Sequence, residues 1–245
     1  MTNLNEGLQP PSVLIFDWHG TLVDTHDAMF SAMEEMLPQL EELGLVEQLL
    51  PEDQCRTEDD ARLVRYIRIY RRLHPRILAE RRVSRTDIFN AIFGENKAAK
   101  LVAHKAYNQA YRKYFGQVKP FQPGAYEYLS ALKAMGIKLA VCTNRNREFL
   151  DKELSMVDEG RWSNLFDATV CADDVTEYKP DPEVITRVLE KLGLPVDEQA
   201  WYVGDSYVDM LTANRAGVSG VFYNGACWEP DRIDSWFSYR DAPAA

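Results

Sequence analysis

The fold is decided by one stretch near the start of the chain, which reads Val13-Leu14-Ile15-Phe16-Asp17-Trp18-His19-Gly20-Thr21-Leu22-Val23-Asp24. Its first four residues are large and apolar, a pattern typical of a strand buried on both faces, and such strands favour a parallel sheet. Ligands bind open parallel sheets outside the carboxyl ends of the strands. Asp17, directly after the strand, therefore stands where a nucleophile is expected.

Three later segments repeat this arrangement, each with different polar groups after an apolar run. They are Thr143-Asn144, Lys179-Pro180-Asp181, and Gly204-Asp205-Ser206 with Asp209. The carboxyl ends of parallel strands meet at one edge of a sheet, so we expect these groups to form one constellation with Asp17.

The four motifs, in this order, resemble those of the haloacid dehalogenase (HAD) superfamily of aspartate-nucleophile phosphohydrolases, in particular its phosphoglycolate phosphatase-like members. The usual first motif is D-x-D-G-T-[LV]-x-D, and His19 replaces its second aspartate here. The resemblance extends from about Val13 to Tyr223. It implies an α/β fold, with a doubly wound parallel-sheet, Rossmann-like core and an inserted all-α cap domain that covers the active site and selects the substrate.

The hydrophobic periodicity agrees with this division of the chain. Residues 25–118 are expected to form the helical cap domain, with helices at 28–43, 57–73, 84–93 and 97–114. Residues 1–24 and 119–245 are expected to form the core domain. After the first strand, the core pattern predicts strands at 137–142, 168–171, 200–203 and 220–223, and helices at 130–135, 146–154, 182–192 and 207–216.

Composition limits the possible partners. The chain has 245 residues, 46% of them apolar, and a formal net charge of -10, which argues against a general nucleic-acid binder. No apolar run is long enough to span a membrane and the N-terminus is polar, so we expect a cytoplasmic protein that acts on a small phosphorylated substrate, as a monomer or a homodimer. The scattered cysteines suggest neither zinc nor disulfides, and Cys142 is expected in the core: Cys55, Cys142, Cys171 and Cys227.

The resemblance implies a role for each motif. Asp17 would attack phosphorus and form an aspartyl phosphate. Mg²⁺ would be held by Asp17, the backbone carbonyl of His19 and Asp205, because hard oxygen ligands suit this ion. Asp209 would orient Asp205 or a metal-bound water.

The remaining motif residues would bind the phosphoryl group. Thr143, Asn144 and Gly20 are expected to contact its oxygens, and Lys179 to neutralise both that group and Asp17. Considered alone, Thr143-Asn144 is equally typical of a helix cap, and Lys179 of a surface lysine. Two arginines that follow the second motif either reach substrate or face water: Arg145 and Arg147.

His19 stands where the family usually has the aspartate that protonates the leaving oxygen and then activates water. An imidazole can in principle do both. Because Lys179 and a metal ion disfavour imidazolium, we expect a fair base and a poor acid, which suits acyl, enol or aryl phosphates or makes the enzyme slow on alkyl esters. The alternative is that His19 only packs and hydrogen-bonds beneath the cap.

The expected cap carries an arginine-rich helix face, with Arg62, Arg65, Arg68, Arg72 and Arg76 three or four residues apart. This face either pairs with acids or recognises an anion, on a substrate or on a partner of a catalytically weakened protein. Phosphomutase relatives remain a minor alternative. The Asp17-Trp18 form of the motif also resembles phosphonoacetaldehyde hydrolase, but residues 25–96 hold no lysine for its Schiff base. The Asp205 to Asp209 motif disfavours the metal-free dehalogenases.

Overall fold

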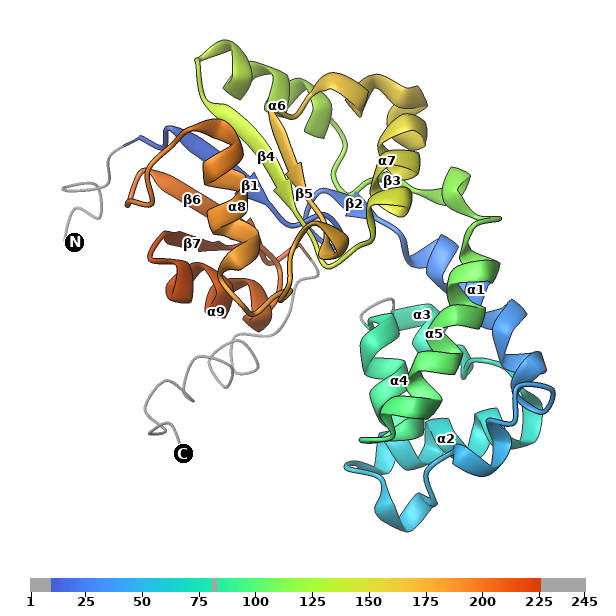
Figure 1. The fold of residues 1–245 in the computed structure, drawn as a ribbon. Coiled ribbons are helices and arrows are strands. Elements are labelled where there is room, and N and C mark those ends of the chain that lie inside the picture. The colour runs from blue at the N-terminus through green and yellow to red at the C-terminus, as the bar shows by residue number, and fades with distance from the viewer. Residues whose placement is uncertain (1–9, 81–82, 226–245) are drawn as a thin grey trace, which may run out of the picture. The chain divides into compact units, whose positions relative to one another are not determined.

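The computed structural model describes residues 10–80 and 83–225, and the chain divides into two compact units (Figure 1). One unit comprises Met1–Asp24 with Lys119–Ala245, and the other comprises Thr25–Val118. Within the described ranges, no helix is both long and apolar enough to cross a membrane.

The first unit is built on a parallel sheet. Among the described residues its five strands follow the order β5-β4-β1-β6-β7 (Figure 1). β1 lies at the centre, where Ile15 pairs with Ala140 on one side and Tyr202 on the other. The strands are β1 (Val13–Phe16), β4 (Lys138–Cys142), β5 (Ala168–Val170), β6 (Ala200–Gly204) and β7 (Ser219–Phe222).

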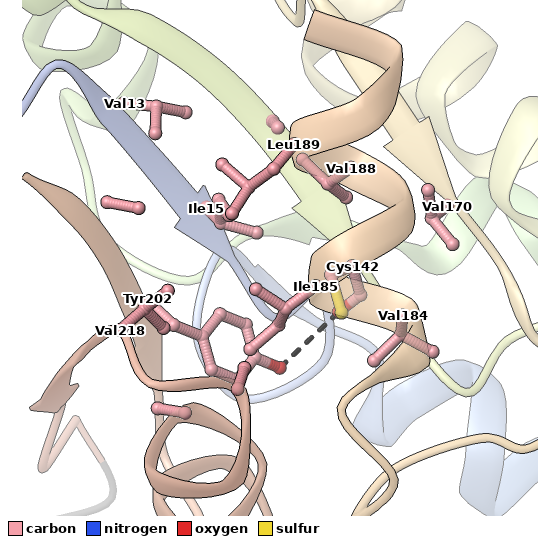
Figure 2. Close-up of a cluster of buried hydrophobic side chains, with 14 of the residues drawn as sticks. Val13, Ile15, Cys142, Val170, Val184, Ile185, Val188, Leu189, Tyr202 and Val218 are labelled. Carbon is pink, nitrogen blue, oxygen red and sulfur yellow. Dashed lines mark hydrogen bonds between the residues drawn. The ribbon is translucent and has the colours of Figure 1, made fainter. Parts of the chain in front are cut away.

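Helices cover both faces of this sheet because successive side chains on a strand point to opposite sides. Val13 and Ile15 share one buried cluster with apolar residues of α8 (Glu183–Leu192) and α9 (Tyr207–Ala216) (Figure 2). The alternating positions face the other side, where α6 (Ala125–Ala134) packs on β4. The predicted doubly wound α/β core is confirmed, and Cys142 is a buried core residue as expected.

The chain leaves and re-enters this unit through a second, two-stranded sheet that the sequence did not predict. β2 (Val23–Asp24) pairs antiparallel with β3 (Lys119–Pro120). A strand of two residues is too short to show an alternating hydrophobic pattern in the sequence. The other elements of the unit are α7 (Arg147–Met156) and the 3₁₀ segments η5 (Val157–Asn164) and η6 (Ala172–Asp174). Cys227 lies outside the described residues.

The second unit is helical, as predicted. α1 packs on α5, and α2 packs on α4. Thr57 and Ser84 accept hydrogen bonds as N-caps of α2 and α4, which explains why those helices begin where the sequence indicated. The elements are α1 (His26–Met36), η1 (Leu37–Leu40), η2 (Val46–Gln48), η3 (Glu52–Gln54), α2 (Glu58–Tyr70), α3 (Pro75–Glu80), α4 (Arg85–Phe93), α5 (Lys97–Tyr111) and η4 (Phe115–Gln117).

The boundary near Pro75 differs from the prediction. α2 ends at Tyr70 rather than at residue 73, because Arg71 adopts a left-handed conformation with φ of 54°. Pro75 then begins the separate helix α3, at the position where a missing N–H costs nothing.

The arginine-rich face of α2 makes its contacts within the same unit. Arg62 pairs with Glu58 and Asp59, and Arg65 Nε donates to Glu52 Oε2 at 2.9 Å. Arg68 donates to the carbonyl oxygens of Leu49 and Leu50, and Arg72 Nε donates to Glu34 Oε2 at 2.8 Å. These contacts favour the interpretation of a paired helix face over that of a free anion-binding face.

Candidate active site

The predicted groups meet at the carboxyl edge of the sheet. Asp17 follows β1, Thr143 follows β4 and Asp205 follows β6. Lys179 lies in the segment before α8, and Asp209 lies in the first turn of α9. The convergence follows from the topology, since β4 and β6 are the two neighbours of β1.

Lys179 is buried at the centre of this site, where it contacts two of the aspartates. Its Nζ atom donates to Asp17 Oδ1 at 2.7 Å and to Asp209 Oδ1 at 2.8 Å, and only 7% of the residue is exposed. Burial disfavours its charged form, but the two carboxylates outweigh burial and raise the pKa of Lys179. The surface-lysine interpretation is wrong, because this ammonium is a fixed internal cation.

Tyr202 is a site residue that the sequence did not reveal. Its hydroxyl accepts from Lys179 Nζ at 3.0 Å and donates to Asp209 Oδ1 at 2.8 Å. The ring belongs to the buried cluster on β6, and the hydroxyl also lies 3.5 Å from the carbonyl oxygen of Cys142 (Figure 2). Burial first, and then the negative charge of Asp209, raise the pKa of Tyr202. The phenol therefore stays protonated between the ammonium and the carboxylate.

Asp209 is fixed from both ends of its carboxylate. Oδ1 accepts from Lys179 and Tyr202, while Oδ2 accepts from the backbone N–H of Ser206 at 3.1 Å, in a reciprocal capping box at the start of α9. Burial raises its pKa, but the Lys179 charge and the hydrogen bonds outweigh burial, so the pKa of Asp209 is lowered. A Cβ at Gly204 would lie 2.4 Å from Asp209 Cβ, so glycine makes room for this aspartate.

Gly20 brings the loop that follows β1 against Asp205. Its φ of 79° is in the left-handed region, and a Cβ built on it would lie 2.4 Å from Asp205 Oδ2. The neighbouring Thr21 hydroxyl donates to Asp205 Oδ1 at 3.2 Å. The turn that follows Asp17 thus packs directly on the carboxylate that follows β6.

Thr143 and Asn144 make different contacts. Thr143 is buried, and its hydroxyl accepts from the backbone N–H of Arg145 at 3.2 Å. Asn144 accepts from the backbone N–H of Lys179 at 2.9 Å and donates to the carbonyl oxygen of Lys179 at 3.1 Å. The Asn144 amide therefore holds the segment that carries Lys179.

The site has an excess of negative charge. Burial, reinforced by Asp209, raises the pKa of Asp17 to about 6 even though Lys179 opposes the shift. Burial and then the Asp17 and Asp209 charges raise the pKa of Asp205 to about 7. When all three carboxylates are ionised, three negative charges face the one positive charge of Lys179, which leaves two.

This excess and its geometry fit a divalent cation. Asp17, Asp205 and Asp209 each offer a carboxylate oxygen, and these atoms lie within 4.8 Å of one another. Carboxylate oxygens suit Mg²⁺ and similar hard ions, and an ion of charge two would balance the cluster. Asp209 already uses both oxygens on protein donors, which leaves Asp17 and Asp205 as the better ligands.

His19 lies beside a buried acid. Its Nε2 atom is 3.6 Å from Glu153 Oε2, and Trp18 Nε1 donates to the same oxygen at 2.7 Å. Arg145 Nη2 donates to Glu153 Oε1 at 2.6 Å, and the Arg145 side chain is only 9% exposed.

The second arginine after the Thr143-Asn144 motif is also paired. Arg147 pairs with Asp174 and donates to Thr169 Oγ1 at 2.6 Å. Neither arginine simply faces water, contrary to one of the two interpretations of the sequence.

Comparison with known proteins gives the class of this fold and site. The family model for haloacid dehalogenase-like hydrolases matches residues 14–222. A phosphoglycolate phosphatase from Rhodospirillum rubrum is 31% identical, over 86% of this chain and 78% of its own. A HAD-superfamily hydrolase of subfamily IA from Geobacter sulfurreducens superposes with a TM-score of 0.55 at 25% identity, over 87% of this chain and 88% of its own.

The chain therefore belongs to the haloacid dehalogenase-like hydrolases, as its motifs indicated. It spans little more than half the length of some relatives. A pyrophosphatase PpaX from Halalkalibacterium halodurans is 33% identical over 54% of this chain and 59% of its own.

Proposed function

We propose that this protein is a Mg²⁺-dependent phosphatase that hydrolyses a small phosphorylated metabolite through an aspartyl phosphate on Asp17. The observation that carries this proposal is the buried contact of 2.7 Å between Lys179 Nζ and Asp17 Oδ1, beside Asp205 and Asp209. Phosphate monoesters repel an attacking carboxylate, so a catalyst must place one in line and supply positive charge. Related phosphoglycolate phosphatases support the reaction class.

The metal would be held by Asp17, Asp205 and the backbone carbonyl of His19, with Asp209 orienting Asp205 or a water. When bound, it lowers the repulsion between the carboxylates and the phosphate oxygens. Gly20 permits the approach of the loop to Asp205, and a side chain there would occupy the space of the carboxylate.

The reaction has two displacements. A carboxylate oxygen of Asp17 bonds to phosphorus while the bond from phosphorus to the ester oxygen breaks, and that oxygen leaves with the electron pair and takes up a proton from solvent. Water then attacks phosphorus and gives a proton to His19, the bond to Asp17 breaks, and inorganic phosphate leaves. Two steps through a covalent intermediate replace one difficult displacement.

The other predicted residues support the phosphoryl group. Lys179 supplies positive charge on the side of Asp17, and the Thr143 hydroxyl and adjacent backbone N–H groups donate to phosphoryl oxygens. Asn144 contributes by fixing the backbone of Lys179, since both of its amide groups are used there. His19 activates water, and we expect substrates whose leaving oxygen needs little protonation.

A binding protein with an anion-recognising cap face has less support. Four of the arginines that suggested it contact acids or carbonyl oxygens of their own unit. Transfer to a second sugar hydroxyl, as in phosphomutase relatives, would use the same groups and differs only in the acceptor.

Turnover of p-nitrophenyl phosphate and of a broad panel of phosphate monoesters, with Mg²⁺ and with EDTA, tests the proposal. We expect hydrolysis that requires the metal and is lost in Asp17→Asn. Asp151→Asn, the same chemical change at a side chain that is 60% exposed, should retain full activity. Activity that persists in Asp17→Asn, or a folded wild type without turnover on any phosphate, would overturn the proposal.

A further inference from the structure

Helix α7 carries a fully buried acid, Glu153. Its Oε2 atom accepts from Trp18 Nε1 at 2.7 Å and lies 3.6 Å from His19 Nε2, while Oε1 accepts from Arg145 at 2.6 Å. One carboxylate thus contacts the two residues that follow the nucleophile and the residue that follows Thr143-Asn144.

Trp18 needs an acceptor for its buried indole N–H, but a neutral acceptor would serve, so the charge of Glu153 is not explained by this contact. The indole packs edge-on against Trp162 and Phe166, with ring centroids 5.9 and 6.3 Å away. A buried carboxylate is costly unless it is paired, and here Arg145 pairs with it inside the protein. The chain therefore maintains a buried ion pair whose acid faces the position at which this sequence departs from the family motif.

The charge of Glu153 acts on the imidazole of His19. A separation of 3.6 Å is too long for a hydrogen bond but short enough for a strong charge interaction. A carboxylate beside Nε2 favours the imidazole form with its proton on that atom, because the N–H dipole then points at negative charge.

We propose that Glu153 is a positioning residue for His19, and that the two side chains are matched. Glu153 holds the imidazole in the orientation and tautomer that the reaction needs. The aspartate usual at position 19 would instead bring a second carboxylate to the side of the loop that faces Glu153, and like charges repel. Glu153 thus accounts for an imidazole at this position.

A double-mutant cycle of His19→Asp and Glu153→Gln tests this match, first by thermal unfolding without metal. We expect His19→Asp to lower Tm by about 3 °C or more with Glu153 present, and by much less in the Glu153→Gln background, whatever Glu153→Gln itself costs by removing the partner of Arg145. A purely structural Glu153 would give the same loss with either residue at position 19. Additive effects would therefore overturn the inference.

The kinetic readout rests on the proposed function. With His19 present, Glu153→Gln should lower kcat on p-nitrophenyl phosphate by about tenfold with little change in KM, since it misplaces an acid–base group. In the His19→Asp background the same change should raise kcat. Glu190→Gln, at a side chain that is 65% exposed, is the matched control and should show no coupling to position 19.

His19→Asn covers the case in which His19→Asp does not fold. Glu153→Gln should cost about tenfold in kcat with His19 present and nothing in the His19→Asn background, because no imidazole remains to be oriented. Equal costs in both backgrounds would overturn the inference. A wild type without phosphatase activity would overturn the proposed function, while the Tm cycle would still decide whether positions 19 and 153 are matched.

Discussion

Gly20 and Asp205 occupy adjoining space: a Cβ on Gly20 would lie 2.4 Å from Asp205 Oδ2. The two residues come from loops that follow neighbouring parallel strands, β1 and β6. Their contact fixes the distance between the loop that carries the proposed nucleophile and the proposed metal ligand. Gly20 therefore meets two requirements: its backbone is left-handed, and it has no Cβ to collide with Asp205.

Gly20→Ala should therefore lower activity by more than the strain of a left-handed alanine backbone explains. We expect kcat to fall by about 100-fold, because the methyl group displaces Asp205. Gly136→Ala is the matched control, since Gly136 has φ of 87° with nothing within 4 Å of its Cβ position. Both variants should lose about 1 kcal/mol of stability, but Gly136→Ala should keep its activity. Equal activity in the two variants would refute the close-contact account.

Tyr202→Phe should lower both stability and turnover. The variant removes a hydroxyl that contacts Lys179 and Asp209, and we expect a loss of about 1 to 3 kcal/mol with kcat reduced about tenfold and KM little changed. Urea unfolding and steady-state kinetics measure the two effects. Tyr128→Phe, at a residue that is 66% exposed, should change neither. Wild-type kinetics in Tyr202→Phe would show that the hydroxyl does not position Lys179.

Lys179→Met should be among the most damaging single changes. Removing one partner of a buried charge cluster costs about 3 to 5 kcal/mol, because Asp17 and Asp209 are left without their common cation. Activity should be lost as well. Lys191→Met removes a lysine that is 42% exposed and should cost less than about 1 kcal/mol. A stable Lys179→Met protein would mean that the carboxylates are not held ionised by this lysine.

The stabilisation by Mg²⁺ should increase with pH. The pKa of Asp17 is raised to about 6 and that of Asp205 to about 7, mainly by burial, from 3.8 in the unfolded chain. The metal-free folded state therefore binds more protons than the unfolded state between about pH 4 and 7, so its stability falls as pH rises through this range. A metal ion that binds the ionised carboxylates reverses the loss.

We expect a shift in Tm of roughly 5 to 10 °C at pH 8 with Mg²⁺ at 100 times its dissociation constant at that pH, and less than half of that shift at pH 5 with the same Mg²⁺ concentration. The titration of His104 makes the folded state more stable as pH rises, which is the opposite direction. Burial and then the nearby Arg85 and Lys100 charges lower the pKa of His104 to about 4. Its contribution cancels when scans with and without Mg²⁺ are compared. An equal shift at both pH values would contradict the charge balance proposed for the site.

The proximity of the motif residues could be predicted from the sequence. Asp17, Thr143 and Asp205 each follow an apolar run, and parallel strands bring such loops to one edge. The helical unit was also predictable, since caps such as Ser84 and the apolar periodicity are local signals.

The residues that the sequence did not reveal act through long-range contacts. Tyr202 looks like any aromatic residue in a strand, and only the fold brings its hydroxyl to Lys179. Glu153 looks like an ordinary polar position of a helix, and nothing local indicates that it is buried against Trp18, which is 135 residues away. β2 and β3 are too short to produce a pattern, and their pairing depends on where the helical unit begins and ends.

The stereochemical course at phosphorus tests the central claim most directly. A phosphorothioate ester made chiral at phosphorus with two oxygen isotopes is hydrolysed in water labelled with the third, and the configuration of the released thiophosphate is determined. Attack by Asp17 followed by attack of water inverts phosphorus twice, so the account predicts net retention. Net inversion would show that water displaces the leaving group directly, and that Asp17 is not the nucleophile.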